Sequence, residues 1–564
     1  MRMSRHLVLL GSVGLVATLV STHPSLAQSA ASETGTASNE VFLGQTGDTN
    51  TVTITQTGSG HLVGGNSDTL QLNQLGDRNT VTILQVGADS GIGRRNMIGQ
   101  PGGLTGLVGT ATGLFQRGDN NGLDIIQRSR RDAEGSQIGA IEQNAPSRSG
   151  LMPADGSANR ATIRQTGGEY LPLSSDRGDS TGVARHVIRE ISQTYRPMAI
   201  NVAPNTIDVS QTGERQEVGQ LRQAGTGNSL TLTQEGLANS LRISKQIGEN
   251  NLSSIRLTGQ SNTLGNAEQD GVSNRVSLRV DGSGNFIDQT VQAGLGGVGE
   301  GRGNVITASI VGDDNGGEGT GGYRALSAQE TVAGAFASSL EQYGDGNALS
   351  LTIGAEGIGR ADGNYFSSAQ RGSDNAAYGL MTGDGNEFAL SQDGDGNQLD
   401  ITQASSVIRS TGDSTRAGNT AHLQQIGDNN LADLKQSGAG NRLDMEIGGD
   451  RNLLATSQTG SGHRIDLRIE GSDNLRPEPR AGRLPTRGDA LVRSIVQEGI
   501  GHVASLDITG DENVALMRQT GTRNIVSGAI KGTANTANTS QTGANQVTIF
   551  RQFGDLNYLN VRQQ

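Results

Sequence analysis

Apolar and polar residues alternate with a period of two in short segments along the chain. In Asn50–Gln56 and Asn79–Gln85, Asn, two aliphatic residues and Gln fall on one parity, and Thr fills most of the other. Successive side chains of a strand point to opposite faces, and β-branched residues favour strands. Each segment therefore predicts a β-strand with one face of Asn, Val, Ile and Gln. The same pattern recurs at 228–234, 397–403 and 557–563.

The phrase Gln-x-Gly-x-x-Asn separates these segments. It occurs intact fourteen times, and successive copies often begin eleven residues apart, as at Gln223 and Gln234 or Gln425 and Gln436. Glycine adopts a positive φ without steric cost, and Asp or Asn can hydrogen-bond the neighbouring backbone, so the residues between Gln and Asn predict a turn.

A fixed short period predicts a repeat architecture. Because one strand cannot bury its apolar face alone, we expect two eleven-residue units to form a rung of about 22 residues, with rungs stacked roughly 4.8 Å apart. The predicted fold is all-β: a stacked β-solenoid of strand-turn-strand rungs interrupted by irregular inserts. Ile447 and Ile508 stand where the period would place Gln, so the two faces of a rung need not be identical.

Stacking places like residues above one another, so inward Asn and Gln side chains are expected to form amide ladders along the stack. The ladder and turn positions of the clearest units form the candidate site. They are Gln45, Gly47, Asn50, Gln56, Gln74, Gly76, Asn79, Gln85, Gln223, Gly225, Asn228, Gln234, Gln392, Gly394, Asn397, Gln403, Gln425, Gly427, Asn430, Gln436, Gly438, Asn441, Gln519, Gly521, Asn524, Gln552, Gly554, Asn557 and Gln563.

Interruptions of the period predict the domain organisation. Repeats are expected at 41–128, 206–291, 336–475 and 491–564. Between them we expect a Pro-containing insert at 129–205, a Gly-rich insert at 292–335, a short insert at 404–418 and a Pro-rich insert at 476–490. Proline cannot donate to a central ladder, so these segments should loop out or cap the repeats.

The N-terminus has the pattern of a signal peptide. Arg2 and Arg5 are followed by an apolar stretch, and Ser25-Leu26-Ala27 fits a cleavage site. We therefore expect residues 1–27 to be a signal peptide, 28–40 to be a flexible leader, and the processed protein to be exported without an integral membrane segment.

Composition narrows the function. Aromatic residues make up 3% of the chain, Trp and Cys are absent, and 85 residues are Gly. Such a composition also fits disorder, but the period-two strands favour a thin solenoid interior. The absence of Cys excludes disulfides and thiolate sites. The formal net charge of −12 and the lack of a basic stripe argue against nucleic-acid binding.

Several isolated signals have structural interpretations. His61, His463 and His502 stand in the Asn slot, far apart in sequence, and are expected to replace an amide rather than bind a metal.

Frequent Gly-Asp pairs resemble calcium-binding β-rolls, but the period is eleven and turn chemistry explains them. Arg-Gly-Asp at Arg117, Arg177 and Arg487 is attributed to chance. The Thr-x-Thr pairs are not sustained along one face, as an ice-binding surface would require. We expect no cofactor, metal or catalytic residues.

The unit resembles the curlin repeat of curli, the extracellular amyloid fibres of bacteria, whose consensus is Ser-x5-Gln-x-Gly-x2-Asn-x-Ala-x3-Gln. Gln45-Gly47-Asn50-Val52-Gln56 and Gln552-Gly554-Asn557-Leu559-Gln563 fit it, with a larger aliphatic residue in the Ala slot. The resemblance implies a cell-surface fibre that supports adhesion and biofilm matrix. It also implies partners: other curlin-like subunits, an outer-membrane export channel and periplasmic accessory proteins.

Our leading hypothesis is a fibre subunit whose end rungs recruit further copies. The alternative is a monomeric solenoid adhesin that binds a surface or glycan through its inserts. A β-helix polysaccharide lyase or hydrolase is the enzymatic alternative, but the chain offers few aromatic side chains for stacking on sugars.

Overall fold

The computed structural model describes residues 15–20, 26–28, 39–58, 61–64, 72–87, 97–98, 113–128, 136–145, 158–166, 186–196, 203–294, 303–316, 338–354, 359–405, 418–475 and 494–564. The chain forms two compact units, and each is described by itself. Unit 1 comprises Met1–Val276 and Val298–Glu300, and unit 2 comprises Ser277–Gly297 and Gly301–Gln564.

Unit 1 consists of two parallel sheets, A and B, as predicted for an all-β solenoid. Sheet A contains β5 (Thr51–Thr57), β8 (Thr80–Val86), β11 (Asn121–Arg128), β13 (Asn159–Thr166), β15 (Asn205–Asp208), β17 (Ser229–Thr231) and β19 (Leu252–Gln260). Sheet B contains β3 (Glu40–Val41), β4 (Leu43–Thr46), β6 (Leu62–Val63), β7 (Leu72–Leu75), β9 (Met97–Ile98), β10 (Leu114–Arg117), β12 (Gln137–Asn144), β14 (Val187–Tyr195), β16 (Glu217–Thr226), β18 (Ser240–Glu249) and β20 (Thr263–Val272).

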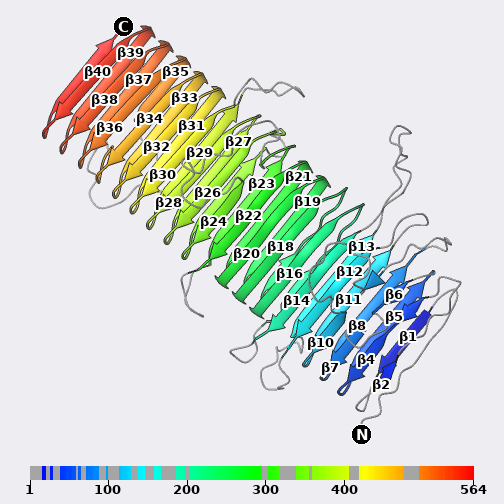
Figure 1. The fold of residues 1–564 in the computed structure, drawn as a ribbon. Helices are drawn as coiled ribbons and strands as arrows, with labels where there is room; N and C mark the ends of the chain where they lie inside the picture. The colour runs from blue at the N-terminus through cyan, green and yellow to red at the C-terminus, as the bar shows by residue number, and fades with distance from the viewer. Residues whose placement is uncertain are drawn as a thin grey trace, which may run out of the picture. The chain divides into compact units, whose positions relative to one another are not determined.

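Unit 2 repeats this architecture, and its strands lie side by side in chain order (Figure 1). Sheet A contains β23 (Val305–Val311), β25 (Ala348–Ile353), β27 (Ala376–Thr382), β29 (Gln398–Ser405), β31 (Leu431–Ala439), β33 (Leu453–Ser461), β35 (Ile495–Ile500), β37 (Val514–Thr522), β39 (Thr536–Ala544) and β41 (Tyr558–Gln563). Sheet B contains β22 (Phe286–Ala293), β24 (Ser339–Tyr343), β26 (Tyr365–Arg371), β28 (Glu387–Asp393), β30 (Thr420–Ile426), β32 (Arg442–Gly448), β34 (Arg464–Glu470), β36 (Val503–Thr509), β38 (Ile525–Lys531) and β40 (Val547–Phe553). β21 (Arg275–Ser283) includes the boundary between the units.

Strands alternate between the two sheets along the chain, so each rung contributes to both. The parallel register pairs like positions of successive units, as with Gln519 and Gln541 or Gly521 and Gly543 in β37 and β39. These partners are 22 residues apart in sequence, which confirms the rung expected from two eleven-residue units. In unit 1 the corresponding spacing is 23 residues from Gln223 to Gln246.

The core lies between the two sheets of each unit and is thin. In β5, burial alternates along the strand, with Val52 2% exposed and Ile54 1% exposed. Gln56 is on the same inward face and is fully buried. The inward face therefore combines aliphatic side chains with amides, as the period-two pattern predicts.

Strands also occur inside two ranges that the sequence analysis treats as inserts. β12, β13 and β14 lie within 129–205 and pair in register with repeat strands on either side. β23 lies within 292–335 and pairs with β25. β12, β13 and β14 keep the inward aliphatic and Gln pattern, as in Ala161-Thr-Ile163-Arg-Gln165, and β23 has Ile310 in the Gln position. None of the four is followed by the intact Gln-x-Gly-x-x-Asn phrase on which the expectation relied. The insert at 476–490 lies outside the described residues.

At the start of the chain, two strands run against the direction of the ladder. β1 (Leu15–Val20) pairs antiparallel with β5, and β2 (Leu26–Gln28) pairs antiparallel with β4. Because of this pairing, β1 and β2 occupy the edge of the first parallel rung. Both strands fall almost entirely within the expected signal peptide.

The residues that the structure describes contain no helix, and so no helix that is long and apolar enough to cross a membrane.

Candidate functional site

The inward glutamines form side-chain ladders parallel to the backbone ladder. In sheet A of unit 2, Gln497 Nε2 donates to Gln519 Oε1 at 2.8 Å, and Gln519 Nε2 donates to Gln541 Oε1 at 3.0 Å. The second N–H of Gln519 reaches the Val503 carbonyl of the facing sheet at 3.0 Å. Gln519 thus donates both along the stack and across the rung, which compensates the desolvation of its buried amide.

The other glutamines of the candidate site lie in the same kind of ladder. Nε2-to-Oε1 bonds join Gln45 to Gln74, Gln56 to Gln85, Gln223 to Gln246, Gln392 to Gln425, Gln403 to Gln436 and Gln541 to Gln563. Gln234 differs, since its Nε2 donates to the preceding Gln211 at 2.7 Å. Gln552 has no glutamine before it, because its register partner is Ile530.

The asparagines form a second ladder, which links three rungs at a time. The backbone N–H and the Nδ2 of Asn535 both donate to Asn513 Oδ1 at 3.0 Å. Asn535 Nδ2 also donates to the Gly554 carbonyl of the next rung at 2.8 Å. Asn557 in turn donates both groups to Asn535 Oδ1 at 2.9 Å. Each asparagine thus fixes the turn beside it and the spacing of its neighbours.

The other chosen asparagines behave alike. The later residue of each pair donates to Oδ1 of the earlier one in the pairs Asn50 and Asn79, Asn228 and Asn251, Asn397 and Asn430, and Asn419 and Asn441. Asn524 has a histidine before it and donates its backbone N–H to His502 Nδ1 at 3.1 Å.

The turn glycines are required by packing between rungs as well as by φ. Gly521 has φ +112°, and a Cβ there would lie 2.1 Å from the Gly543 carbonyl oxygen. Gly47, with φ +114°, would meet the Gly76 oxygen at 2.0 Å. A side chain would therefore push the two rungs apart. The sequence predicts these glycines from their positive φ alone and gives no sign of this close approach.

A second position in the turn also has a positive φ. It is the residue directly before the Asn, and it is often not Gly, as with Arg451 (φ 56°), Asp473 (φ 58°) and Arg523 (φ 53°). Other turns have Gly here, including Gly462 at φ 66°. A non-Gly residue in this left-handed region is strained by roughly 1–2 kcal/mol. The sequence signal was the enrichment of Asn, Asp and Gly before the Asn.

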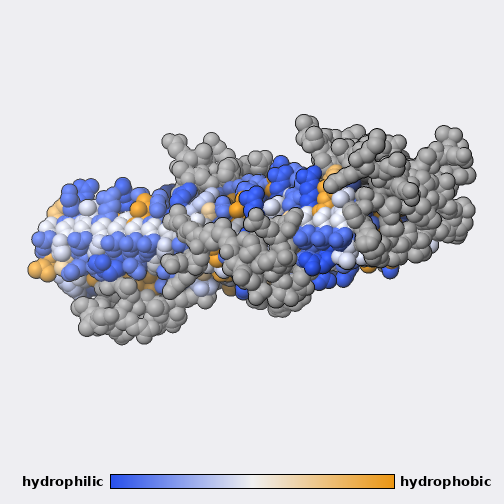
Figure 2. Space-filling view, turned by 90° about the horizontal axis from the view of Figure 1, so that it is seen from below, coloured by the Kyte–Doolittle hydropathy of each residue, from blue (hydrophilic) through white to orange (hydrophobic). Residues whose placement is uncertain are grey.

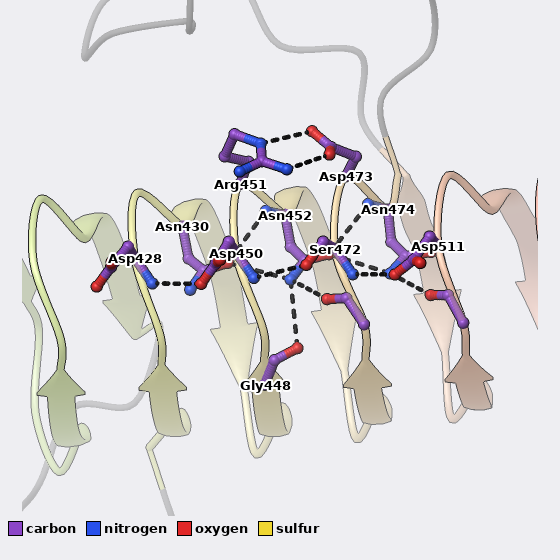
Figure 3. A network of polar contacts seen from close by, with 12 residues as sticks. Asp428, Asn430, Gly448, Asp450, Arg451, Asn452, Ser472, Asp473, Asn474 and Asp511 are labelled. Atoms are coloured by element: carbon purple, nitrogen blue, oxygen red, sulfur yellow. Dashed lines mark hydrogen bonds and ion pairs between the residues drawn. The ribbon is translucent and has the colours of Figure 1, made fainter.

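Turn aspartates form a third ladder (Figure 3). The backbone N–H of Asp428 donates to Asp450 Oδ1 at 3.0 Å. The N–H of Asp450 reaches Ser472 Oγ at 3.2 Å, and that of Ser472 reaches Asp511 Oδ1 at 2.8 Å. Side chains in this slot therefore accept an N–H from the preceding rung. This contact explains the frequent Gly-Asp pairs without a bound cation.

Histidines replace asparagine in the ladder while keeping its hydrogen-bond pattern. His463 and His502 occupy adjacent rungs, with ring centroids 5.0 Å apart and planes inclined by 6°. The backbone N–H of His502 donates to His463 Nδ1 at 3.2 Å, and His463 Nε2 lies 3.1 Å from the Thr459 carbonyl. Nδ1 thus replaces the Asn Oδ1, and Nε2–H replaces the Nδ2–H. Both ring nitrogens are occupied, which leaves no lone pair for a metal.

The other ladder histidines are His61, which the sequence analysis placed in the Asn slot, and His186, which it missed because no intact phrase precedes it. His61 Nε2 lies 2.9 Å from the Thr57 carbonyl, and His186 Nε2 lies 3.0 Å from the Thr166 carbonyl. Burial lowers the pKa of His61, His186, His463 and His502 below the usual 6.5. Within the described ranges, no group of three or more His, Asp or Glu side chains is arranged to hold a metal ion.

A charged cluster lies on the outward face of sheet B in unit 2. His422 lies 3.2 Å from Asp444 through Nδ1 and 3.4 Å from Glu387 through Nε2, and Arg442 Nε lies 2.6 Å from Asp444. Burial alone would lower the pKa of His422, but the two carboxylates raise it to about 9. Burial would raise the pKa of Asp444, but His422 and Arg442 lower it to about 2. An adjoining groove of about 460 Å³ is lined by both charge signs, including Asp466.

The last described rung is open on one side. Gln546 Oε1 is buried without a hydrogen-bond partner. Ile549 is 73% exposed, Phe553 65% and Leu556 80%. Hydrophobic colour is visible at the left of Figure 2, on the side where β40 and the C-terminus lie in Figure 1. The geometry can therefore accept another rung.

Comparison with known proteins agrees with this geometry. A search of curated proteins finds no match. The family model described as the curlin associated repeat matches residues 36–64 and 417–446. The first match includes the Gln45 and Asn50 ladder positions, and the second includes those at Gln425, Asn430, Gln436 and Asn441. This confirms the resemblance drawn from the sequence, since the curlin associated repeat matches the chain at two places, one in each unit.

Proposed function

We propose that this protein is a structural subunit of an extracellular curli-type amyloid fibre that supports cell adhesion and biofilm matrix. The observation that carries the proposal is the combination of curlin repeats with an open last rung. Parallel strands in register, with amide ladders running through them, are the arrangement found within cross-β fibres. Curlin repeats belong to a structural family, which favours assembly over catalysis.

Assembly in this proposal needs no ligand. An exposed strand edge presents N–H and C=O groups that template a further strand. The exposed Ile549 and Phe553 add apolar surface that a further rung can partly cover. The expected signal peptide directs the chain out of the cytoplasm. By analogy with curli, an outer-membrane channel and periplasmic accessory proteins deliver it to the cell surface.

The test is seeded assembly of the processed chain, residues 28–564, followed by thioflavin T fluorescence and electron microscopy. The proposal predicts a lag phase that preformed fibres shorten. A stable, soluble, β-rich monomer under the same conditions would contradict it and would favour the monomeric adhesin instead.

A further inference from the structure

The groove on the outward face of sheet B in unit 2 has no part in the ladders or in the proposed assembly. It has a volume of about 460 Å³ and is lined by residues of six strands, β26, β28, β30, β32, β34 and β36. These strands pair in register one after another and lie side by side in Figure 1. Five spacings of roughly 4.8 Å separate β26 from β36, so the groove is about 24 Å long. It is therefore a narrow channel that runs along the stack of rungs.

Two buried serines at the β26 and β28 end of the groove have hydroxyls without a partner. Ser367 is 4% exposed and Ser391 is 1% exposed, and neither Oγ has a hydrogen-bond partner. Both side chains lie at outward positions of their strands, next to the inward Phe366 and Gln392, and both line the groove. A buried hydroxyl without a hydrogen bond is unfavourable. A ligand in the groove that bonds these hydroxyls would remove that cost.

The charged residues of the groove compensate one another. Asp444 pairs with His422 at 3.2 Å and with Arg442 at 2.6 Å, and Arg468 lies 3.8 Å from Glu446. A phosphate, a polyanion or a cation would have to compete with these pairs and would meet a like charge beside each opposite one. An uncharged ligand meets no such competition. The distribution of charge therefore favours an uncharged ligand.

A row of polar side chains crosses the strands of the groove. The row consists of Ser391, Gln424, Glu446, Arg468 and Asp507, which are partners in register on five successive strands. Asp507 has no ion-pair partner among the residues that the structure describes. Hydroxyl, amide, carboxylate and guanidinium groups thus offer both donors and acceptors at every rung. The hydroxyls of a sugar, which donate and accept, match this mixture.

The repeat of the row also matches a chain of sugars. The pyranose rings of an extended glycan follow one another at a spacing similar to the rung spacing of roughly 4.8 Å. Successive sugars can therefore meet successive strands. None of the described lining residues is aromatic, so no ring is available to stack on a sugar. Each sugar gains only hydrogen bonds, and useful affinity requires several sugars at once.

We propose that this groove binds an uncharged linear glycan, which lies along the stack of rungs and hydrogen-bonds the hydroxyls of Ser367 and Ser391 at one end and the carboxylate of Asp507 at the other. The inference goes beyond the proposed function, because the groove belongs to one unit of a single chain. Binding does not depend on assembly.

Equilibrium dialysis of the processed chain, residues 28–564, measures this binding for soluble and assembled protein alike. The probes are tritium-labelled hexasaccharides of β-1,4-glucose, α-1,4-glucose and β-1,4-N-acetylglucosamine. The proposal predicts saturable binding of at least one hexamer, with about one site per chain. The disaccharide of the same sugar should bind at least tenfold more weakly, because it spans only part of the groove.

Two serine variants locate the site. Ser367→Ala with Ser391→Ala removes no described hydrogen bond, so the fold should be kept, and the dissociation constant should rise about fivefold or more. Ser368→Ala is the matched control. Ser368 is in the same strand, is fully buried and also has an unpartnered Oγ, but it lies on the inward parity, outside the groove. The control should bind as the wild type does.

A groove-filling variant gives an independent test. Ala389 lines the groove and is the register partner of His422, so Ala389→Leu should abolish binding. Ala376→Leu, at an outward position of sheet A, is its control and should bind normally. Circular dichroism of all four variants verifies that the fold is unchanged.

Failure of all three hexamers to bind would overturn the proposal. Equal affinity of the wild type and the serine double variant, or binding that survives Ala389→Leu, would also overturn it by placing the glycan elsewhere. None of these results bears on fibre formation, which seeded assembly tests. Failure of the chain to form fibres would contradict the proposed function and leave the glycan groove intact.

Discussion

The backbone N–H of His502 donates to Nδ1 of His463 across one rung spacing, at 3.2 Å. This bond requires His463 to be neutral, because Nδ1 of a protonated ring carries a hydrogen and cannot accept. His502 Nδ1 accepts the Asn524 N–H in the same way, at 3.1 Å. Both hydrogen bonds therefore require neutral histidines. Protonation of Nδ1 would place a second hydrogen against each backbone N–H and break the bond.

The first prediction is that acid destabilises this region. Burial lowers the pKa of both rings in the folded state, so the unfolded chain binds more protons and stability rises with pH. The contribution is fully present above the unfolded value of 6.5 and declines as the pH falls below it. The two imidazole rings are stacked, so each ring is the titratable group nearest the other. The backbone carbonyl of Thr459 contacts His463, and that of Glu498 contacts His502.

The double variant His463→Asn, His502→Asn restores the common ladder residue at both positions. Urea unfolding of the processed chain at pH 7.5 and 5.0 should show a smaller loss of stability in the variant than in the wild type. His422→Asn is a control of opposite sign: it should increase the acid sensitivity, because it removes a stabilising contribution that grows as the pH falls from 9 toward 6.5. An equal acid sensitivity of wild type and double variant would show that these rings do not carry the effect.

The second prediction concerns His422, whose pKa is raised to about 9. The folded state binds a proton that the unfolded chain releases near 6.5, so this contribution is fully present below 6.5 and is lost as the pH rises toward 9. His422→Gln should remove the decline in stability between pH 7 and 9.5, measured by urea unfolding. A decline of the same size in the variant would rule out the contacts with Asp444 and Glu387 as its cause.

The third prediction separates the two reasons for glycine in the turn. Gly521→Ala places a Cβ 2.1 Å from the Gly543 oxygen at φ +112°, whereas Gly462→Ala meets no atom within 4 Å at φ +66°. Gly462→Ala should cost about 1 kcal/mol, from the left-handed conformation alone. Gly521→Ala should cost clearly more, because the rungs must also separate. Equal losses of unfolding free energy would show that packing between rungs adds nothing.

The fourth prediction is stabilisation at a strained turn. Arg523 is exposed and has φ 53°. Arg523→Gly should raise the unfolding free energy by about 0.5–1 kcal/mol, because relief of strain exceeds the entropy cost of glycine. The same change at Arg551, an exposed strand position, should lower it by about 0.5–1 kcal/mol. A loss of stability in Arg523→Gly would contradict the assigned turn conformation.

The fifth prediction tests the open rung in assembly. Gln552→Ala with Asn557→Ala removes two side chains that face a further rung, while most of the protein is unchanged. Seeded growth should slow at least severalfold, with the circular dichroism of the soluble chain preserved. Arg551→Ala is the control, since its side chain points outward from the same rung. Unchanged growth of the double variant would mean that this rung is not a growing end.

The repeat pattern was sufficient to predict the all-β solenoid and its rung. Two aliphatic residues and a Gln recur on one parity of the strand, as Val52, Ile54 and Gln56 do. It was insufficient for β12, β13 and β14, where Gln143, Gln165 and Gln193 continue the ladder but begin no intact Gln-x-Gly-x-x-Asn phrase. The close approach at Gly521 could not be predicted either, since it depends on the carbonyl of a turn 22 residues away. The expected role of the candidate site in assembly remains a prediction.

The central claim is that these rungs continue from one molecule to the next. Fibre diffraction from aligned samples of the processed chain tests it most directly. Continued stacking predicts a meridional reflection near 4.7–4.8 Å and an equatorial one near 10 Å, the spacings of strands and of packed sheets. A solution that forms no fibres, or fibres without the meridional reflection near 4.7–4.8 Å, would contradict the account.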